Sequence, residues 1–327
     1  MWFAALKNFS AAIILCSFFG FSSSAFSAVK IGVSDWPGWV AWYVAEQQGF
    51  FKKYGADVEL VWFPNYTDSI QALSAGQLDA NSQTLGDSMA PIAAGIPFKL
   101  ILINDNSAGN DALLAKPAIN TVKDLKGKTI ALEEFSVSHF VLVVALAKHG
   151  MNPRDVKIVN LTAGDAAAAF LAGRVDACVV WNPWINKIIS SGKGKALFTS
   201  KEMLGLIPDA LVARSGSIKA KRADLIGMVR AWYDAEKFIR ENPQEAVKIM
   251  SKVVGLSADE YTVFLPGTRF FGQKENLQAF DAGNAESLLK IAPTIEKFLR
   301  DHKLLEGTLD VAKSLDASLV KEVAGVK

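Results

Sequence analysis

The segment Ala72-Leu-Ser-Ala-Gly-Gln-Leu-Asp-Ala80 occurs in a second, recognisable form as Phe170-Leu-Ala-Gly-Arg-Val-Asp-Ala177. The second copy follows the first by 97 residues, and its glycine and aspartate align with those of the first. A glycine after an apolar helical pattern is typical of a helix end, and a short apolar run after it is typical of a buried strand. The chain therefore carries the same helix-turn-strand unit twice.

The flanks of this unit repeat as well. Ile31-Gly-Val-Ser-Asp35 resembles Ile130-Ala-Leu-Glu-Glu134, and Asp57-Val-Glu-Leu-Val61 resembles Asp155-Val-Lys-Ile-Val159. We therefore expect an α/β protein with two related lobes, each built on a doubly wound sheet, and a cleft between them. Open parallel sheets bind ligands beyond the carboxyl ends of their strands, so two facing lobes can enclose one small molecule.

Each copy is predicted to run strand, helix, strand, helix, strand. In the first copy we expect strands at 29–33, 57–63 and 78–82 and helices at 39–51 and 67–75. In the second we expect strands at 129–132, 156–160 and 177–181 and helices at 138–149 and 165–172. Further strands are expected at 98–103, 111–115 and 207–214, and the tail is expected to be mostly helical, with helices at 224–241, 243–253, 257–263 and 285–302.

The domain organisation follows from the repeat and from the amino terminus. Residues 1–28 have a basic start, an apolar run and a small polar end, which is typical of a cleavable secretory signal peptide. We expect lobe one to comprise 29–112 and 208–327, including the C-terminal helices, and lobe two to comprise 113–207. The chain then crosses between the lobes twice, which makes a hinge.

Composition narrows the function classes. The 327 residues have a formal charge of +2, which leaves no strongly basic surface for nucleic acid. Of the two cysteines, Cys16 lies in the signal peptide, so Cys178 has no partner for a disulfide and is expected to be a buried structural thiol. We expect an exported monomer without cofactor or metal.

The order and spacing of these motifs resemble those of periplasmic substrate-binding proteins of ABC importers, in the nitrate, sulfonate and taurine branch. The resemblance covers nearly all of the mature chain, including Asp124-Leu-Lys-Gly-Lys128 at the start of lobe two. Within the branch, Ser34-Asp-Trp-Pro-Gly-Trp-Val-Ala-Trp42 and Val137-Ser-His139 are most similar to binding proteins associated with urea carboxylase-type enzymes. The resemblance implies a two-lobed type II binding-protein fold, an inner-membrane permease as partner, and a urea- or guanidine-like ligand.

The residues themselves bear on the ligand. The loops after the first strand of each lobe carry Asp35 in lobe one and Glu133 with Glu134 in lobe two, where an anion would otherwise meet helix N-termini. Carboxylates there favour a cationic or donor-rich ligand, and guanidinium presents N–H donors that carboxylates accept in pairs. The candidate ligand-binding residues are Asp35, Trp36, Trp39, Thr84, Asp87, Glu133, Glu134, Ser138, Trp181, Trp184 and Asp209.

Purely structural roles for these residues, and other functions for the protein, stay open. Asp35, Thr84 and Asp87 are also suited to capping helices, Asp209 to stabilising the hinge, and only one of Glu133 and Glu134 is expected to face the cleft. A small oxyanion such as a sulfonate, taurine or nitrate is the alternative ligand, especially if Arg269 reaches the cleft. A ligand sensor shares the same closure. An enzyme is not expected, because no nucleophile pair, phosphate loop or metal spacing is present.

Overall fold

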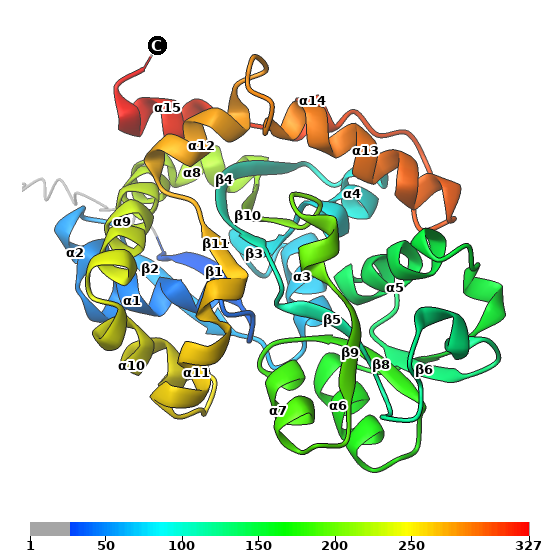
Figure 1. Ribbon diagram of the computed structural model, residues 1–327. Coiled ribbons are helices and arrows are strands. Elements are labelled where there is room, and N and C mark those ends of the chain that lie inside the picture. The colour runs from blue at the N-terminus through cyan, green and yellow to red at the C-terminus, as the bar shows by residue number, and fades with distance from the viewer. Residues whose placement is uncertain (1–26, 327) are drawn as a thin grey trace, which may run out of the picture.

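The computed structural model describes residues 27–326 and contains two sheets, which Figure 1 shows as separate lobes. The sheet of lobe one has the order β11-β4-β10-β3-β1-β2. Strands β2, β1 and β3 run parallel, whereas β10 is antiparallel to both of its neighbours. The strands are β1 (Val29–Val33), β2 (Val58–Trp62), β3 (Ala80–Thr84), β4 (Phe98–Ser107), β10 (Pro208–Arg214) and β11 (Thr268–Phe270).

The sheet of lobe two repeats this plan in the order β7-β6-β8-β5-β9. Its three repeat strands are parallel, and β5 runs antiparallel beside β8. The strands are β5 (Asp111–Ala115), β6 (Thr129–Leu132), β7 (Lys157–Asn160), β8 (Ala177–Trp181) and β9 (Lys195–Thr199). Cys178 is buried in β8, as predicted for a structural thiol.

Helices cover both sheets (Figure 1). Those of the two lobes are α1 (Trp42–Gln47), α2 (Phe50–Lys53), α3 (Tyr66–Ser74), α4 (Leu85–Ala93), α5 (Val137–Lys148), α6 (Ala163–Leu171) and α7 (Trp184–Ser190). The C-terminal helices are α8 (Ser215–Ala220), α9 (Arg222–Glu241), α10 (Pro243–Val253), α11 (Ala258–Phe264), α12 (Gln273–Phe280), α13 (Leu288–Asp301), α14 (Val311–Ser314) and α15 (Ser318–Ala324). Short 3₁₀ turns are η1 (Trp39–Ala41), η2 (Val122–Leu125), η3 (Pro153–Asp155), η4 (Ser200–Met203) and η5 (Leu265–Gly267).

The aspartate of the repeated segment connects the third strand of each lobe to the first by a hydrogen bond. Asp79 accepts a hydrogen bond from the amide of Lys30 in β1 at 2.9 Å, and Asp176 accepts one from the amide of Thr129 in β6 at 3.0 Å. The glycine before each aspartate has a positive φ, near 79° at Gly76 and 75° at Gly173, which ends the preceding helix in a left-handed turn. The repeated motif is therefore structural, and it fixes the third strand of each lobe beside the first.

The chain passes from the lobe-one sheet to the lobe-two sheet between β4 and β5, and returns between β9 and β10. The C-terminal tail then lies along lobe one until α13, which also reaches lobe two. Figure 1 shows α13 beside α5. There Phe298 of α13 contacts Phe140 of α5, with ring centroids 5.2 Å apart. No helix of residues 27–326 is sufficiently long and apolar to span a membrane.

Several elements differ from the sequence predictions. The helix expected over 39–51 is broken into η1, α1 and α2, because Gly49 takes a left-handed φ of 72° between the last two. Arg269, expected in the helical tail, lies on β11, which extends the lobe-one sheet. Helices α4 and α7 and strand β9 were not predicted. The expected signal peptide lies outside the described residues except for positions 27 and 28.

Candidate ligand-binding site

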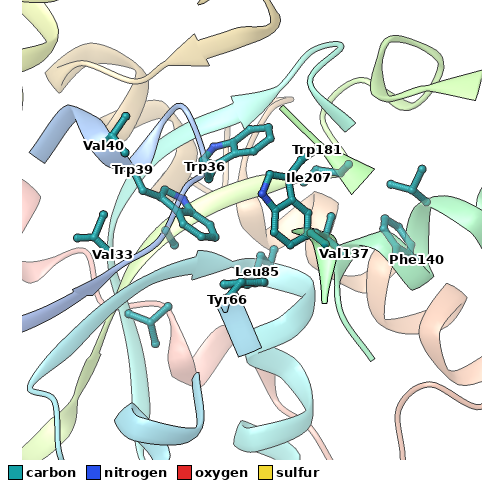
Figure 2. Packing of buried hydrophobic residues seen from close by; sticks show 14 of the residues in the cluster. Val33, Trp36, Trp39, Val40, Tyr66, Leu85, Val137, Phe140, Trp181 and Ile207 are labelled. Carbon is teal, nitrogen blue, oxygen red and sulfur yellow. The ribbon is translucent and has the colours of Figure 1, made fainter. Parts of the chain in front are cut away.

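A small cavity lies between the two lobes, where the carboxyl ends of β1, β3 and β8 meet. Four aromatic rings line it, those of Trp36, Trp39, Tyr66 and Trp181. Figure 2 shows Trp36 and Trp39 on one side and Trp181 on the other, with Tyr66 below them. Its volume is about 10 Å³, about the minimum needed to admit one water molecule. The remaining lining residues are Thr84, Asp111, Val137, Ile207 and Asp209.

The rings form a continuous set. Trp39 lies 4.9 Å from Tyr66 between centroids, and Tyr66 meets Trp181 edge-on at 5.9 Å. Trp36 completes the set beside Trp39 at 6.3 Å. Trp181 comes from β8 of lobe two, whereas the other three rings come from lobe one. The set of four rings therefore forms only when the lobes are in contact.

Hydrogen bonds across the cleft hold the lobes in this arrangement. Asp35, after β1, accepts the indole N–H of Trp181 at one carboxylate oxygen and that of Trp184 at the other, both at 2.8 Å. Glu133 of lobe two accepts the hydroxyl of Thr67 of lobe one at 2.6 Å. These contacts make Asp35 and Glu133 bridges between the lobes in the closed form.

A third interlobe contact occupies a helix N-terminus. Asp87 of α4 accepts the amide of Val137, the first residue of α5, at 3.2 Å, and the hydroxyl of Tyr66 at 2.8 Å. On lobe one, the carboxyl group of Asp105 packs so closely on Gly38 that a Cβ there would approach it to 2.0 Å. The protein's own Asp87 carboxyl group therefore occupies the N-terminus of α5, which an anionic ligand would otherwise use.

Burial raises the pKa of each carboxyl group around the cavity. The pKa of Asp35 rises to about 6, and those of Asp87, Asp105 and Asp111 to about 7, in every case mainly because the charged form loses its solvation. Burial raises the pKa of Asp209 well above its usual value, and the Asp105 charge adds to this effect. The raised pKa favours the protonated form of Asp209, and the Oδ2 atoms of Asp105 and Asp209 have no hydrogen-bond partner in the described residues.

In the described part of the chain, no basic side chain balances these acids. Among residues 27–326 no lysine or arginine is buried, and none lines the cavity. Arg269 is half exposed and pairs with Glu286 at 3.0 Å on the surface of lobe one, so it does not enter the cleft. His139 is neutral, because burial lowers its pKa to about 4.

The predicted site residues fall into three groups. Trp36, Trp39, Thr84, Trp181 and Asp209 line the cavity. Asp35, Asp87, Glu133 and Trp184 make the interlobe contacts around it. Glu134 and Ser138 do not line it: Glu134 borders a separate outer groove, and Ser138 is buried in α5 with a hydroxyl that has no hydrogen-bond partner in the described part of the chain.

Sequence reasoning missed Tyr66, Asp105, Asp111, Val137 and Ile207. Tyr66 begins the helix after β2, and Asp105 and Asp111 flank the first crossing between the lobes. The available signal was position, because strand ends and crossings are where cleft residues of such folds lie.

Three comparisons place the chain among known proteins. A family model described as NMT1-like matches residues 24–255. A Brucella abortus protein named only as a binding protein is 28% identical over 229 residues, 68% of this chain and 70% of the relative. The taurine-binding periplasmic protein of Escherichia coli is 33% identical over 158 residues, 48% of each chain.

A solved structure extends the likeness to the whole fold. The alkanesulfonate-binding protein SsuA from Xanthomonas axonopodis pv. citri, bound to MOPS, superposes with a TM-score of 0.76 at 20% identity. The alignment covers 89% of this chain and 99% of that one. The predicted two-lobed binding-protein fold is thereby confirmed.

Proposed function

Because this chain belongs to the NMT1-like family, we propose that it is the periplasmic solute-binding component of an ABC importer, which captures a small polar molecule and delivers it to a membrane permease. Relatives that are named as periplasmic binding proteins support this proposal. In this account lobe one comprises 29–112 and 208–327, lobe two comprises 113–207, and residues 1–28 direct export.

Capture works through closure of the lobes. A cavity of about 10 Å³ is too small for any organic solute to enter, so the ligand binds while the lobes are apart and enlarges the enclosed space as they close. Its contacts with both lobes add to the Asp35 and Glu133 bridges and stabilise the closed form relative to the open one. The permease then distinguishes loaded from empty protein by this shape.

We propose a cationic or donor-rich nitrogen compound, guanidine- or urea-like, as the ligand. The observation that carries this proposal is the lining itself: four aromatic rings and two aspartates, without a lysine or arginine among them. Guanidinium stacks on aromatic faces and donates several N–H bonds to carboxylates. Two or three charge-assisted hydrogen bonds of about 1.5–3 kcal/mol each suffice, with stacking, for micromolar binding, which requires about 8 kcal/mol.

The second candidate is a small oxyanion such as a sulfonate, taurine or nitrate. The names of the relatives favour it over a guanidine-like ligand, since they include taurine- and alkanesulfonate-binding proteins. Against it, a sulfonate in this cavity would face Asp111 and Asp209, and Asp87 already occupies the first amide of α5. Taurine combines both chemistries, because its ammonium group suits the aspartates.

Two other functions, those of an enzyme and of a ligand sensor, have less support from the residues. An enzyme needs a nucleophile and a base in contact, but Ser138 and His139 are neighbours on α5, and the Ser138 hydroxyl has no partner in residues 27–326. A ligand sensor would use the same closure and would dock on a membrane receptor in place of a permease.

A thermal-shift screen of the mature protein tests the ligand class. The panel is guanidinium and urea on one side, and taurine, an alkanesulfonate and nitrate on the other, each at low millimolar concentration and matched ionic strength. A ligand that binds only the native protein raises the melting temperature by mass action. A rise with guanidinium or urea alone supports the proposal, whereas a rise with the anions alone contradicts it and establishes the oxyanion function.

A further inference from the structure

Asp111 is one of the two aspartates that line the cavity. It is the first residue of β5, directly opposite Trp181 in the register of β8, and its side chain is 2% exposed. Its Oδ2 atom has no hydrogen-bond partner in the described chain, and the Ser107 hydroxyl pairs with the hydroxyl of Ser200 at 2.7 Å. Since the residue lines the cavity, a ligand enclosed between the lobes would lie against this carboxyl group.

The ionisable groups that surround Asp111 within the cleft are acids. Asp87 on α4, Asp105 on β4 and Asp209 on β10 all interact electrostatically with it. A negative charge on Asp111 in the closed form is therefore opposed by burial and by the charge of Asp87.

The elements that pack on β5 are β8, β9, α5 and α7, and they supply no counter-charge. Their lysines are engaged elsewhere: Lys195 with the carbonyl of Pro117 and with Asn120, Lys148 with the carbonyl of Glu202, and Lys187 over the Trp184 ring. Burial keeps His139 of α5 neutral by lowering its pKa, and it keeps the Cys178 thiol of β8 neutral by raising its pKa.

This arrangement leaves two ways to close the lobes over Asp111. Either its carboxyl group carries a proton, or a cation from outside the chain balances its charge. Burial raises its pKa to about 7, so both forms are accessible near neutral pH.

We propose that Asp111 is the counter-ion of the ligand, and that a bound organic cation takes the place of the proton that Asp111 carries in the closed, ligand-free form. The inference rests on the proposed function, since it assumes that the ligand is a cation. The proton passes to solvent, and the positive charge of the ligand replaces it, so the net charge of the enclosed site is unchanged.

The affinity for a cation should then depend on pH. Below the pKa of Asp111 the cation competes with the proton, and each pH unit lowers the apparent affinity about tenfold. With a pKa of about 7, the dissociation constant should be about tenfold larger at about pH 6 than at about pH 8. A neutral ligand such as urea should lack this dependence.

Isothermal titration calorimetry of the mature protein with guanidinium chloride measures the exchange directly. Titrations are made at about pH 7 in two buffers with different protonation enthalpies and equal ionic strength, and the difference in heat gives the protons released. The expected release is about half a proton for each guanidinium bound at pH 7, falling toward zero at about pH 9.

Asp111→Asn identifies the group that is responsible. Asparagine has the shape and charge of the protonated aspartate, so the variant should melt at or above the wild-type temperature while binding guanidinium about tenfold or more weakly and with less proton release than the wild type. Asp301→Asn, on the exposed face of α13, is the matched control and should behave like the wild type.

The possible results separate the two proposals. Guanidinium binding whose heat is equal in both buffers overturns the role of Asp111 and leaves the cation-binding function standing. Proton release that persists in Asp111→Asn at the wild-type level also overturns it. Binding of taurine or an alkanesulfonate, with none of guanidinium, overturns both.

Discussion

Replacing Asp35 by asparagine should weaken ligand binding by loosening the closed form. In the wild type both carboxylate oxygens accept an indole N–H, from Trp181 and Trp184, at 2.8 Å each. Asparagine keeps one acceptor oxygen and turns an N–H₂ donor toward the other indole. Asp35→Asn therefore loses one charge-assisted hydrogen bond and leaves two buried donors facing each other, a cost of about 2–3 kcal/mol.

This cost falls on the closed form alone, because the two tryptophans belong to the opposite lobe. A penalty of about 2–3 kcal/mol corresponds to a fall of about 30- to 150-fold in ligand affinity. The effect should be largest at about pH 8, where Asp35, with a pKa of about 6, is ionised, and it should shrink toward pH 5 as the wild-type carboxyl group becomes protonated.

The assay is a calorimetric titration with guanidinium at about pH 8. Trp184→Phe removes one indole N–H and keeps an aromatic ring, so Asp35→Asn should cost less in that background than alone, as expected for residues in contact. Asp165→Asn, at the exposed start of α6, is the control. An affinity within about threefold of wild type for Asp35→Asn, with an unchanged melting temperature, would refute the assignment of Asp35 as a bridge between the lobes.

Further predictions concern pH, the second bridge, the thiol and the surface arginine. The ligand-free protein should melt at a lower temperature at about pH 8 than at about pH 5. The raised pKa values of Asp35, Asp87 and Asp111 stabilise the folded state below about pH 4, and this contribution is lost as pH rises through 6 to 7. A melting temperature that rises from about pH 5 to about pH 8 contradicts the assignment of these residues as buried acids. Glu133→Gln should weaken ligand binding about threefold to tenfold, because it removes the charge that the Thr67 hydroxyl contacts. Glu134→Gln should leave the dissociation constant unchanged, since only its backbone amide makes a hydrogen bond in the described residues. Equal effects of the two variants in a calorimetric titration would contradict the assignment of Glu133 as the interlobe contact. Cys178 should resist iodoacetamide in the native protein and react after unfolding, because burial raises the pKa of its thiol; rapid native labelling, detected by mass spectrometry, would show that it is accessible. Arg269→Ala should bind both cations and sulfonates as the wild type does, since the arginine pairs with Glu286 outside the cleft, and a selective loss of sulfonate binding would place it at the site.

The repeat predicted most of the two sheets, because strand and helix patterns are local. β1 and β8 lie where the apolar runs placed them, and α10 begins at Pro243, as its sequence indicates. The break at Gly49 was missed because the apolar spacing continues across it, while the left-handed turn depends on how α1 and α2 pack. β11 is only three residues long, too short for a pattern, and it forms because β4 offers a free edge.

The sequence predicted several of the residues that line the candidate site, but it did not predict their hydrogen-bond partners. The local sequence around Asp35 indicates a ligand contact or a helix cap. Its hydrogen-bond partners lie 146 and 149 residues further along the chain, and no local pattern indicates which tryptophans will meet it. Asp111 was read as the start of a strand, which it is. The role that we propose for it follows only from the pairing with β8, which brings it beside Trp181.

The most direct test of the account is a crystal structure of the mature protein with guanidinium. The account predicts closed lobes around a cavity enlarged from that described above, with guanidinium between the rings of Trp39 and Trp181 and its N–H groups donating to the carboxylate of Asp111. Closed lobes that hold a sulfonate on backbone amides, with guanidinium absent from the cavity at millimolar concentration, would contradict the central claim that this is an acidic, aromatic site for a cation.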